Sequence, residues 1–240
     1  MKRVLDFLTD LGSNNNREWF TANKNRYKEA ETVFNAFAGQ LIGAIGEWDE
    51  AVRGLTVRDC TYRIYRDTRF SHDKTPYKTH MGVYVCPGGK KSGNGGYYFH
   101  VEPAIGGEAV SGEGESGGMI GSHALDAGIY MPELSVLKSV RDEIFDNGEE
   151  VLAAISRARQ AAGFELDRSN SLKRTPKGWP IDSEWDEYLK LKDLHLSKMV
   201  DDAYVLAPDL ARRAAKDFRS THDFMTLMYR AARFAREEQA

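Results

Sequence analysis

Hydrophobic positions along the chain follow two different periods. Between Tyr27 and Trp48 apolar residues recur at steps of three and four, which predicts one long helix with a single buried face. Ahead of it, an amphipathic stretch at about 3–10 predicts a short helix that ends before Gly12. Asn15 followed by Glu18 resembles a capping box at the start of the next helical segment.

The middle of the chain is rich in β-branched and aromatic residues, which favour strands. The predicted strands are Val57 to Arg66, Met81 to Cys86 and Gly96 to Glu102, with weaker ones near 108–111 and 117–121. Alternation in the third strand places Tyr97, Phe99 and Val101 toward the core, and Tyr98, His100 and Glu102 on the opposite face. The connections are too short for crossover helices, so the sheet is predicted to be antiparallel.

Helical spacing returns after Pro132, a residue that suits the first turn of a helix. Gly148 is expected to break this run before a second helix at about 149–162. Further helices are predicted at 183–192 and in the C-terminal stretch from Phe224 to Phe234. Strands grouped between helical runs predict a single α+β domain over residues 1–240, a central antiparallel β-sheet packed by a long N-terminal helix and C-terminal helices.

The composition is that of an ordinary globular protein, with 41% hydrophobic and 29% charged residues. No apolar run approaches the roughly 18 residues that a membrane helix needs, and the N-terminus lacks the continuous hydrophobic region of a signal peptide. A soluble cytoplasmic protein is therefore expected. Cys60 and Cys86 lie in apolar, strand-like runs and are predicted to be buried free thiols, with a bridge between neighbouring strands as the alternative.

The distribution of charge says more about a candidate site than the overall composition does. The net charge of −3 disfavours a generic nucleic-acid binder. Positive residues nevertheless gather in two short segments. Residues 58–80 hold Arg58, Arg63, Arg66, Arg69, Lys74 and Lys78 against Asp59, Asp67 and Asp73, and residues 168–178 hold Arg168, Lys173, Arg174 and Lys177 without an acid.

The first basic segment is a candidate anion site, because the planar guanidinium of arginine matches carboxylate and phosphate in a bidentate way. The predicted ligand-binding residues are Arg63, Arg66, Arg69, Lys74 and Lys78, with Tyr77 as a positioning hydroxyl and Arg174 and Lys177 of the second segment closing over the anion. The alternative is a structural loop in which each arginine pairs with an acidic neighbour.

His100 and Glu102 lie two residues apart on one predicted strand face and are candidates for general acid–base catalysis, with a polar, partly exposed sheet face as the alternative. The six histidines form no pair at metal-ligand spacing along the chain, so no metal and no cofactor are predicted. The glycine-rich stretch 87–96 does not fit a phosphate-binding P-loop, and no GxSxG, HExxH or Rossmann GxGxxG motif is present.

Several of these segments together resemble a known family. They are NNNREWF (14–20), RIYRDTRFSHDKTPYK (63–78), YYFHVEP (97–103), GIYMPE (128–133) and LKRTPKGW (172–179). In order and spacing they resemble the widespread conserved hypothetical proteins of bacteria and fungi that carry domain of unknown function 2461. The stretch 104–127 is longer than that pattern. The resemblance implies no activity, but it covers both basic segments and the His100–Glu102 strand.

Three functions follow as hypotheses. The first is binding of a small phosphate- or carboxylate-bearing ligand in an Arg/Lys-lined pocket, and whether the ligand is also processed stays open. The second is a non-catalytic module that docks an acidic partner protein through a flat basic patch. The third is nucleic-acid processing, which the acidic overall charge makes unlikely and which a local basic groove with aromatic residues keeps open. No oligomeric state is predicted.

Overall fold

A five-stranded antiparallel sheet forms the centre of the computed structural model, which describes residues 1–69, 72–104 and 122–237. The strands are β1 (Met81–Val85), β2 (Gly96–Val101), β3 (His123–Ile129), β4 (Glu165–Leu166) and β5 (Leu194–Val200). Their order across the sheet is β1-β2-β3-β5-β4, and every neighbouring pair is antiparallel. The predicted α+β class and antiparallel sheet are confirmed.

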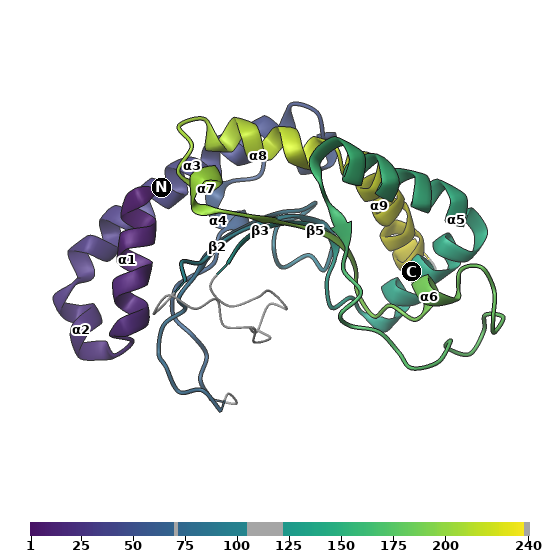
Figure 1. The fold of residues 1–240 in the computed structure, drawn as a ribbon, viewed down its shortest axis with the longest axis horizontal. Helices are drawn as coiled ribbons and strands as arrows, with labels where there is room; N and C mark the ends of the chain where they lie inside the picture. Colours follow the sequence, from purple (N-terminus) through teal and green to yellow (C-terminus); the bar gives the residue numbers. More distant parts are fainter. Residues whose placement is uncertain (70–71, 105–121, 238–240) are drawn as a thin grey trace.

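The helices of the described residues cover one face of this sheet. They are α1 (Lys2–Ser13), α2 (Arg17–Ala22), α3 (Lys24–Gly46), α4 (Val57–Cys60), α5 (Leu134–Ala162), α6 (Asp186–Leu189), α7 (Asp202–Val205), α8 (Leu210–Arg219) and α9 (His222–Glu237), with a 3-10 turn η1 (Glu50–Val52). Helices α3 and α8 lie over the sheet, α1 and α2 lie at one end of the molecule, and α5 packs with α9 at the other (Figure 1). The described helices leave the opposite face open.

Strand β2 shows how the sheet separates its two faces. Tyr97, Phe99 and Val101 are fully buried against the helices, as their alternation predicts. Phe99 meets Phe37 of α3 with ring centroids 4.8 Å apart, and the Tyr97 hydroxyl donates to Asp49 over 2.8 Å. The long helix predicted from the Tyr27–Trp48 stripe is α3, whose buried residues form one face. Tyr98 and His100 point to the open face.

The strand predicted for Val57 to Arg66 is wrong, because residues 57–60 form helix α4 and residues 61–66 belong to none of the five strands. A capping box accounts for the difference: the backbone N–H and hydroxyl of Thr56 both donate to the carboxylate of Asp59, and this favours a helical turn over an extended chain. Beyond α4, Thr61 and Tyr65 form only isolated bridges, to Val83 and Tyr77.

Other boundaries also differ from the sequence prediction. The break in the helix after Pro132 falls at Asn147, inside α5, and Gly148 is required there because a Cβ would lie 2.5 Å from the ring of Trp185. The helix predicted at 183–192 is the single turn α6, whereas β3, β4, β5, α7 and α8 were not predicted. The strands predicted near 108–111 and 117–121 lie outside the described residues.

Two smaller expectations have clear outcomes. Cys60 and Cys86 are buried free thiols, as predicted, and burial raises the pKa of Cys60 to about 12. In the described part of the chain, none of the helices combines the length and apolar character needed to cross a membrane.

Candidate functional site

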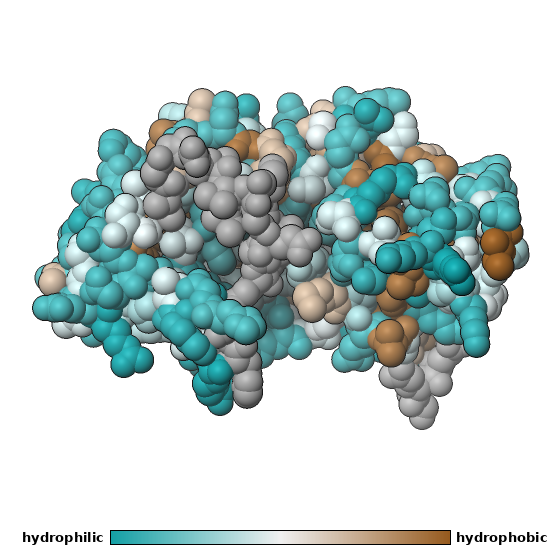
Figure 2. Space-filling view, turned by 60° about the horizontal axis from the view of Figure 1, so that its bottom comes forward, coloured by the Kyte–Doolittle hydropathy of each residue, from teal (hydrophilic) through white to brown (hydrophobic). Residues whose placement is uncertain are grey.

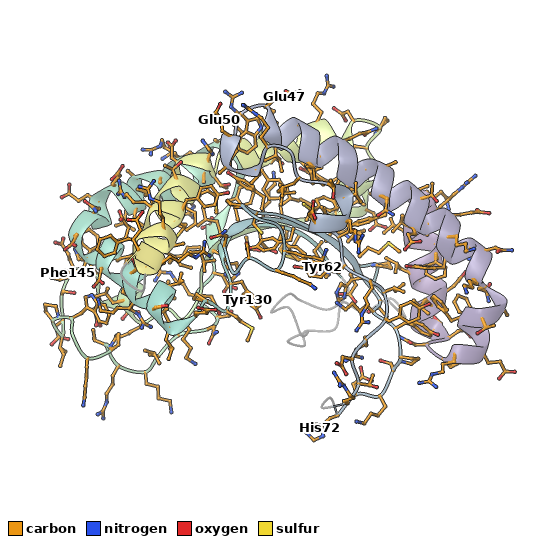
Figure 3. All side chains as sticks on the ribbon, turned by 180° about the vertical axis from the view of Figure 1, so that it is seen from behind. Glu47, Glu50, Tyr62, His72, Tyr130 and Phe145 are labelled. Carbon is orange, nitrogen blue, oxygen red and sulfur yellow. The ribbon has the colours of Figure 1, made fainter. Side chains whose placement is uncertain are left out.

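A large cavity of about 1510 Å³ lies on the open face of the sheet. Its lining comes from β1, β2 and β3, from residues 58–64 around α4, from the loop between β1 and β2, and from residues 130–133 and His195 at the far end. Tyr62 and Tyr130 mark its two sides in Figure 3, both below the sheet on the side away from α3. A second cavity of about 540 Å³, between α3 and residues 53–57, has a mainly glycine and aliphatic wall.

Basic side chains concentrate at the β1 end of the large cavity. They are Arg58, Arg63, Lys78, Lys90 and Lys91, and the carboxylates beside them are Glu31 and Asp59. Glu31 accepts a hydrogen bond from Tyr27, and Asp59 is occupied by the Thr56 cap. The side chains of Arg58, Arg63 and Lys91 form no hydrogen bond or ion pair with another described residue. This end of the cavity therefore carries excess positive charge.

Helix α4 and the β1–β2 loop hold these cations in place. The backbone N–H of Lys90 donates to the Asp59 carbonyl over 2.9 Å, and the Lys90 ammonium donates to the Arg58 carbonyl. Gly89 allows this approach, because its φ of +80° suits glycine and a Cβ would lie 3.1 Å from the Asp59 oxygen. The ammonium groups of Lys78 and Lys90 lie 5.4 Å and 5.9 Å from the ring of Tyr62, within cation–π range.

The remaining basic residues of the first segment do not line the cavity. Arg66 pairs with Asp73 and also donates to Thr75, and Arg69 pairs with Asp67 over 2.6 Å. The side-chain hydrogen bond from Arg69 lowers the pKa of Asp67 to about 2.

Residues 73–75, at the other end of this loop, are also held by hydrogen bonds and ion pairs within the loop. The hydrogen bonds from the Thr75 backbone and from Arg66 lower the pKa of Asp73 to about 2. Lys74 donates to the Thr68 carbonyl over 2.9 Å. Arg66, Arg69 and Lys74 thus fit the alternative of a salt-bridged structural loop, and their role as ligand residues stays a prediction.

Tyr77 is placed in the core. Its ring stacks on Phe20 with centroids 3.9 Å apart, and only 6% of the residue is exposed. Asn15 holds the backbone beside it, donating to the Tyr77 carbonyl over 2.8 Å and accepting from its N–H over 3.1 Å. The predicted capping role of Asn15 is therefore wrong, because Asn16 caps α2 by accepting from the Trp19 N–H. The structure gives Tyr77 a packing role, and a ligand contact by its hydroxyl stays a prediction.

The second basic segment lies at the other end of the molecule. Arg174 and Lys177 are exposed, and neither is among the residues that line the cavity. Thr175 donates to Asp186, and Arg141 lies 5.8 Å from the ring of Trp179. Figures 1 and 3 place residues 167–183 near α5 and α6, across the open face from the loop that carries His72 at its tip. Hydrophilic residues predominate on the α1–α2 side in Figure 2, and hydrophobic patches on the α5 side.

Polar side chains on the open face of β2 form a connected chain, and Tyr98 is the member of it that lines the cavity. The Tyr98 hydroxyl lies 3.0 Å from His100 Nδ1, and His100 Nε2 lies 3.2 Å from Glu102 Oε2. The other oxygen of Glu102 accepts from the Thr79 hydroxyl. Burial acts to raise the pKa of Glu102, but the hydrogen bonds from His100 and Thr79 outweigh it and the pKa is lowered. His100 and Glu102 are thus in contact on one strand face, as predicted, and their catalytic role stays a prediction.

His80 joins this pair, which spacing along the sequence did not reveal. Its Nδ1 lies 4.0 Å from Glu102 Oε1, and its ring centroid lies 4.7 Å from that of His100. Burial, and then the electrostatic interaction with His100, lower the pKa of His80 to about 3, so the His80 imidazole is neutral at physiological pH. Register is the cause of this convergence, because Met81 pairs with Val101 and so the residue before β1 faces the residue after β2.

A second histidine–carboxylate pair lies at the opposite end of the cavity. His195 Nε2 lies 3.1 Å from Asp167 Oδ2, while the buried His195 Nδ1 has no partner among the described residues. Burial acts to lower the pKa of His195, but the hydrogen bond that His195 donates to Asp167 and the charge of Asp126 raise it overall. Gly128 makes room for this residue, since a Cβ there would lie 2.6 Å from the Cβ of His195.

Comparison with known proteins places the chain in a family. Residues 3–113 and 120–227 match the model of the conserved hypothetical proteins DUF2461, so the chain belongs to that family. The interruption at 114–119 falls inside the stretch that is longer than the family pattern. Neither the curated proteins nor the solved structures gave a match.

Proposed function

We propose that the cavity on the open face binds a small anionic ligand bearing phosphate or carboxylate. The observation that supports this most directly is the group of five basic side chains at its β1 end. Three of them, Arg58, Arg63 and Lys91, have no ion-pair partner among the described residues. Guanidinium and ammonium groups that outnumber the carboxylates beside them repel one another, and an anion between them would relieve that repulsion.

The shape of the site favours a small ligand over an acidic partner protein. A docking module would present its cations on a flat surface, whereas these line one end of a cavity of about 1510 Å³. The ring of Tyr62, which lies near the ammonium groups of Lys78 and Lys90, could stack on a flat ligand group. Phosphorylated metabolites and nucleotides fit this combination best.

Thermal and chemical denaturation with added anions tests the proposal. Inorganic phosphate, pyrophosphate, citrate and a nucleoside triphosphate should be compared at constant ionic strength. A ligand at about 100 times its dissociation constant stabilises the folded protein by about 2.7 kcal/mol. Arg63→Ala should weaken the binding by tenfold or more, because a hydrogen bond to a charged group contributes about 1.5–3 kcal/mol.

Arg69→Ala is the matched control. It removes the same charge from the same segment, but its guanidinium pairs with Asp67 and does not line the cavity. If no anion stabilises the wild type, or if Arg63→Ala and Arg69→Ala weaken binding equally, the cavity is not the anion site.

A further inference from the structure

Three potential metal-ligand side chains converge at the edge of the cavity. His80, His100 and Glu102 each offer one ligand atom, and these atoms all lie within 4.8 Å of one another. The separation between His100 Nε2 and Glu102 Oε2 is 3.2 Å. Two ligand atoms bound to one tetrahedral zinc ion at about 2.0–2.1 Å lie about 3.3 Å apart, so this edge of the cluster already has the required spacing.

The sheet holds the cluster in a fixed arrangement. His100 and Glu102 come from one face of β2 and its end, and His80 comes from the residue before β1 in the paired strand. Opposite His100 stands Gly82, where a Cβ would lie 2.4 Å from the Tyr98 hydroxyl. Glycine at this position therefore lets Tyr98 lie beside His100.

Groups around the cluster orient its members as the outer shell of a metal site does. The Tyr98 hydroxyl partners His100 Nδ1, which leaves Nε2 as the ligand nitrogen. Glu102 accepts from the Thr79 hydroxyl, and its backbone N–H donates to His123 Nδ1 over 3.1 Å. Histidine ligands usually have their second nitrogen engaged in this way, which fixes both tautomer and ring orientation.

Hydrogen bonding alone does not explain the position of His80. The His100–Glu102 pair is complete without it, and the ring of His80 forms no hydrogen bond with another described residue. Its closest carboxylate oxygen is at 4.0 Å, too far for a hydrogen bond. An ion bound between the three groups would use all of them.

We propose that His80, His100 and Glu102 bind a divalent transition-metal ion, with Zn²⁺ as the ion to test first. Two imidazoles and one carboxylate form the ligand set of many zinc sites that keep a fourth position for water or substrate, and the same set suits iron(II). His80 also lines the cavity, so the ion lies at its wall. The phosphate or carboxylate of the proposed ligand could then occupy the fourth position.

Calorimetric titration of Zn²⁺ into the full-length, chelator-treated protein tests the site. One equivalent should bind. His80→Asn and Glu102→Gln should each raise the dissociation constant at least about 100-fold, since even outer-shell changes cost 10–100-fold. His72→Asn is the matched control, because His72 is an exposed histidine at the tip of the loop and should leave the affinity unchanged (Figure 3).

His80→Asn is the more informative variant because it breaks no hydrogen bond within the described residues, and circular dichroism should confirm that it folds. Visible absorption of the Co²⁺-loaded wild type gives an independent readout of nitrogen and oxygen coordination. The proposal is overturned if the wild type binds no zinc, or if His80→Asn binds it as tightly as His72→Asn does. Anion binding that depends on Arg63 but not on zinc would leave the proposed function intact and remove the metal site alone.

Discussion

The two faces of β2 are almost equally buried but differ in chemistry. Tyr97, Phe99 and Val101 pack against the helices, whereas His100 is 6% and Glu102 5% exposed on the side that the described helices leave open. A buried polar group costs free energy unless it is hydrogen-bonded. The open face satisfies this requirement through a continuous chain from Tyr98 to Thr79.

This difference suggests different roles for the two faces. Apolar burial on the helix side accounts for stability. A buried hydrogen-bonded network of ionisable groups adds little net stability, because well-packed apolar residues can often replace it at no cost. The presence of histidine and carboxylate side chains beside a large cavity is therefore better explained by binding.

The largest loss of stability is expected from a substitution on the helix-facing side of β2. Phe99→Ala should lower the free energy of unfolding by about 3–5 kcal/mol, because it removes a fully buried ring that packs on Phe37. Urea denaturation measures the loss. Zinc and anion affinities of the folded protein should stay within about twofold, since the ring points away from the cavity. An equal loss of stability in His100→Ala, with unchanged ligand affinities, would show that both faces serve stability alone.

Local patterns in the sequence predicted the two faces of β2 but not the site. The alternation of Tyr97 to Glu102 and the stripe along α3 are properties of consecutive residues, and both predictions are confirmed. The convergence of His80 with His100 depends on the register between β1 and β2, which spacing along the chain does not reveal. Strands β3 and β5 pair with each other, and neither was predicted from the sequence.

The first basic segment, residues 58–80, also shows what local sequence patterns cannot predict. The net positive charge of the segment could be read from the sequence. Which of its basic residues pair with acids, and which line the cavity, could not. Asp67 and Asp73 each lie within pairing distance of several arginines along the chain, and only the loop geometry assigns them to Arg69 and Arg66. Of the predicted ligand residues, Arg63 and Lys78 line the cavity. Arg58 and Lys90 line it as well but were not proposed as ligand residues.

A smaller, pH-dependent effect is expected at the other end of the open face. Asp167 and the charge of Asp126 raise the pKa of His195 despite its burial. The folded state therefore holds the His195 proton more tightly than the unfolded state does, whose pKa is about 6.5. The resulting stability is fully present below pH 6.5 and is lost as the pH rises through the folded pKa.

His195→Gln should consequently cost more stability at about pH 5.5 than at about pH 8.5, on either side of the ordinary pKa of histidine. The cost at the lower pH should be about 1.5–3 kcal/mol, the contribution of a hydrogen bond to a charged group. Urea denaturation at both values measures it. Asp167→Asn should remove most of the pH dependence, because it removes the carboxylate that pairs with His195. A cost that is the same at both values would mean that His195 is neutral in the folded protein.

The substitution with the smallest expected effect on stability separates the roles of the two faces of β2 most clearly. Tyr98→Phe keeps the half-buried ring and removes the hydroxyl that partners His100 Nδ1, so stability should fall by only about 0.5–1.5 kcal/mol. If the open face is a metal site, zinc affinity should nevertheless fall about 10–100-fold, because His100 loses the group that fixes its tautomer. Tyr97→Phe, on the helix side of the same strand, loses a hydrogen bond to Asp49 and should leave zinc affinity unchanged. Equal zinc affinities in these two variants would show that Tyr98 does not orient a metal ligand.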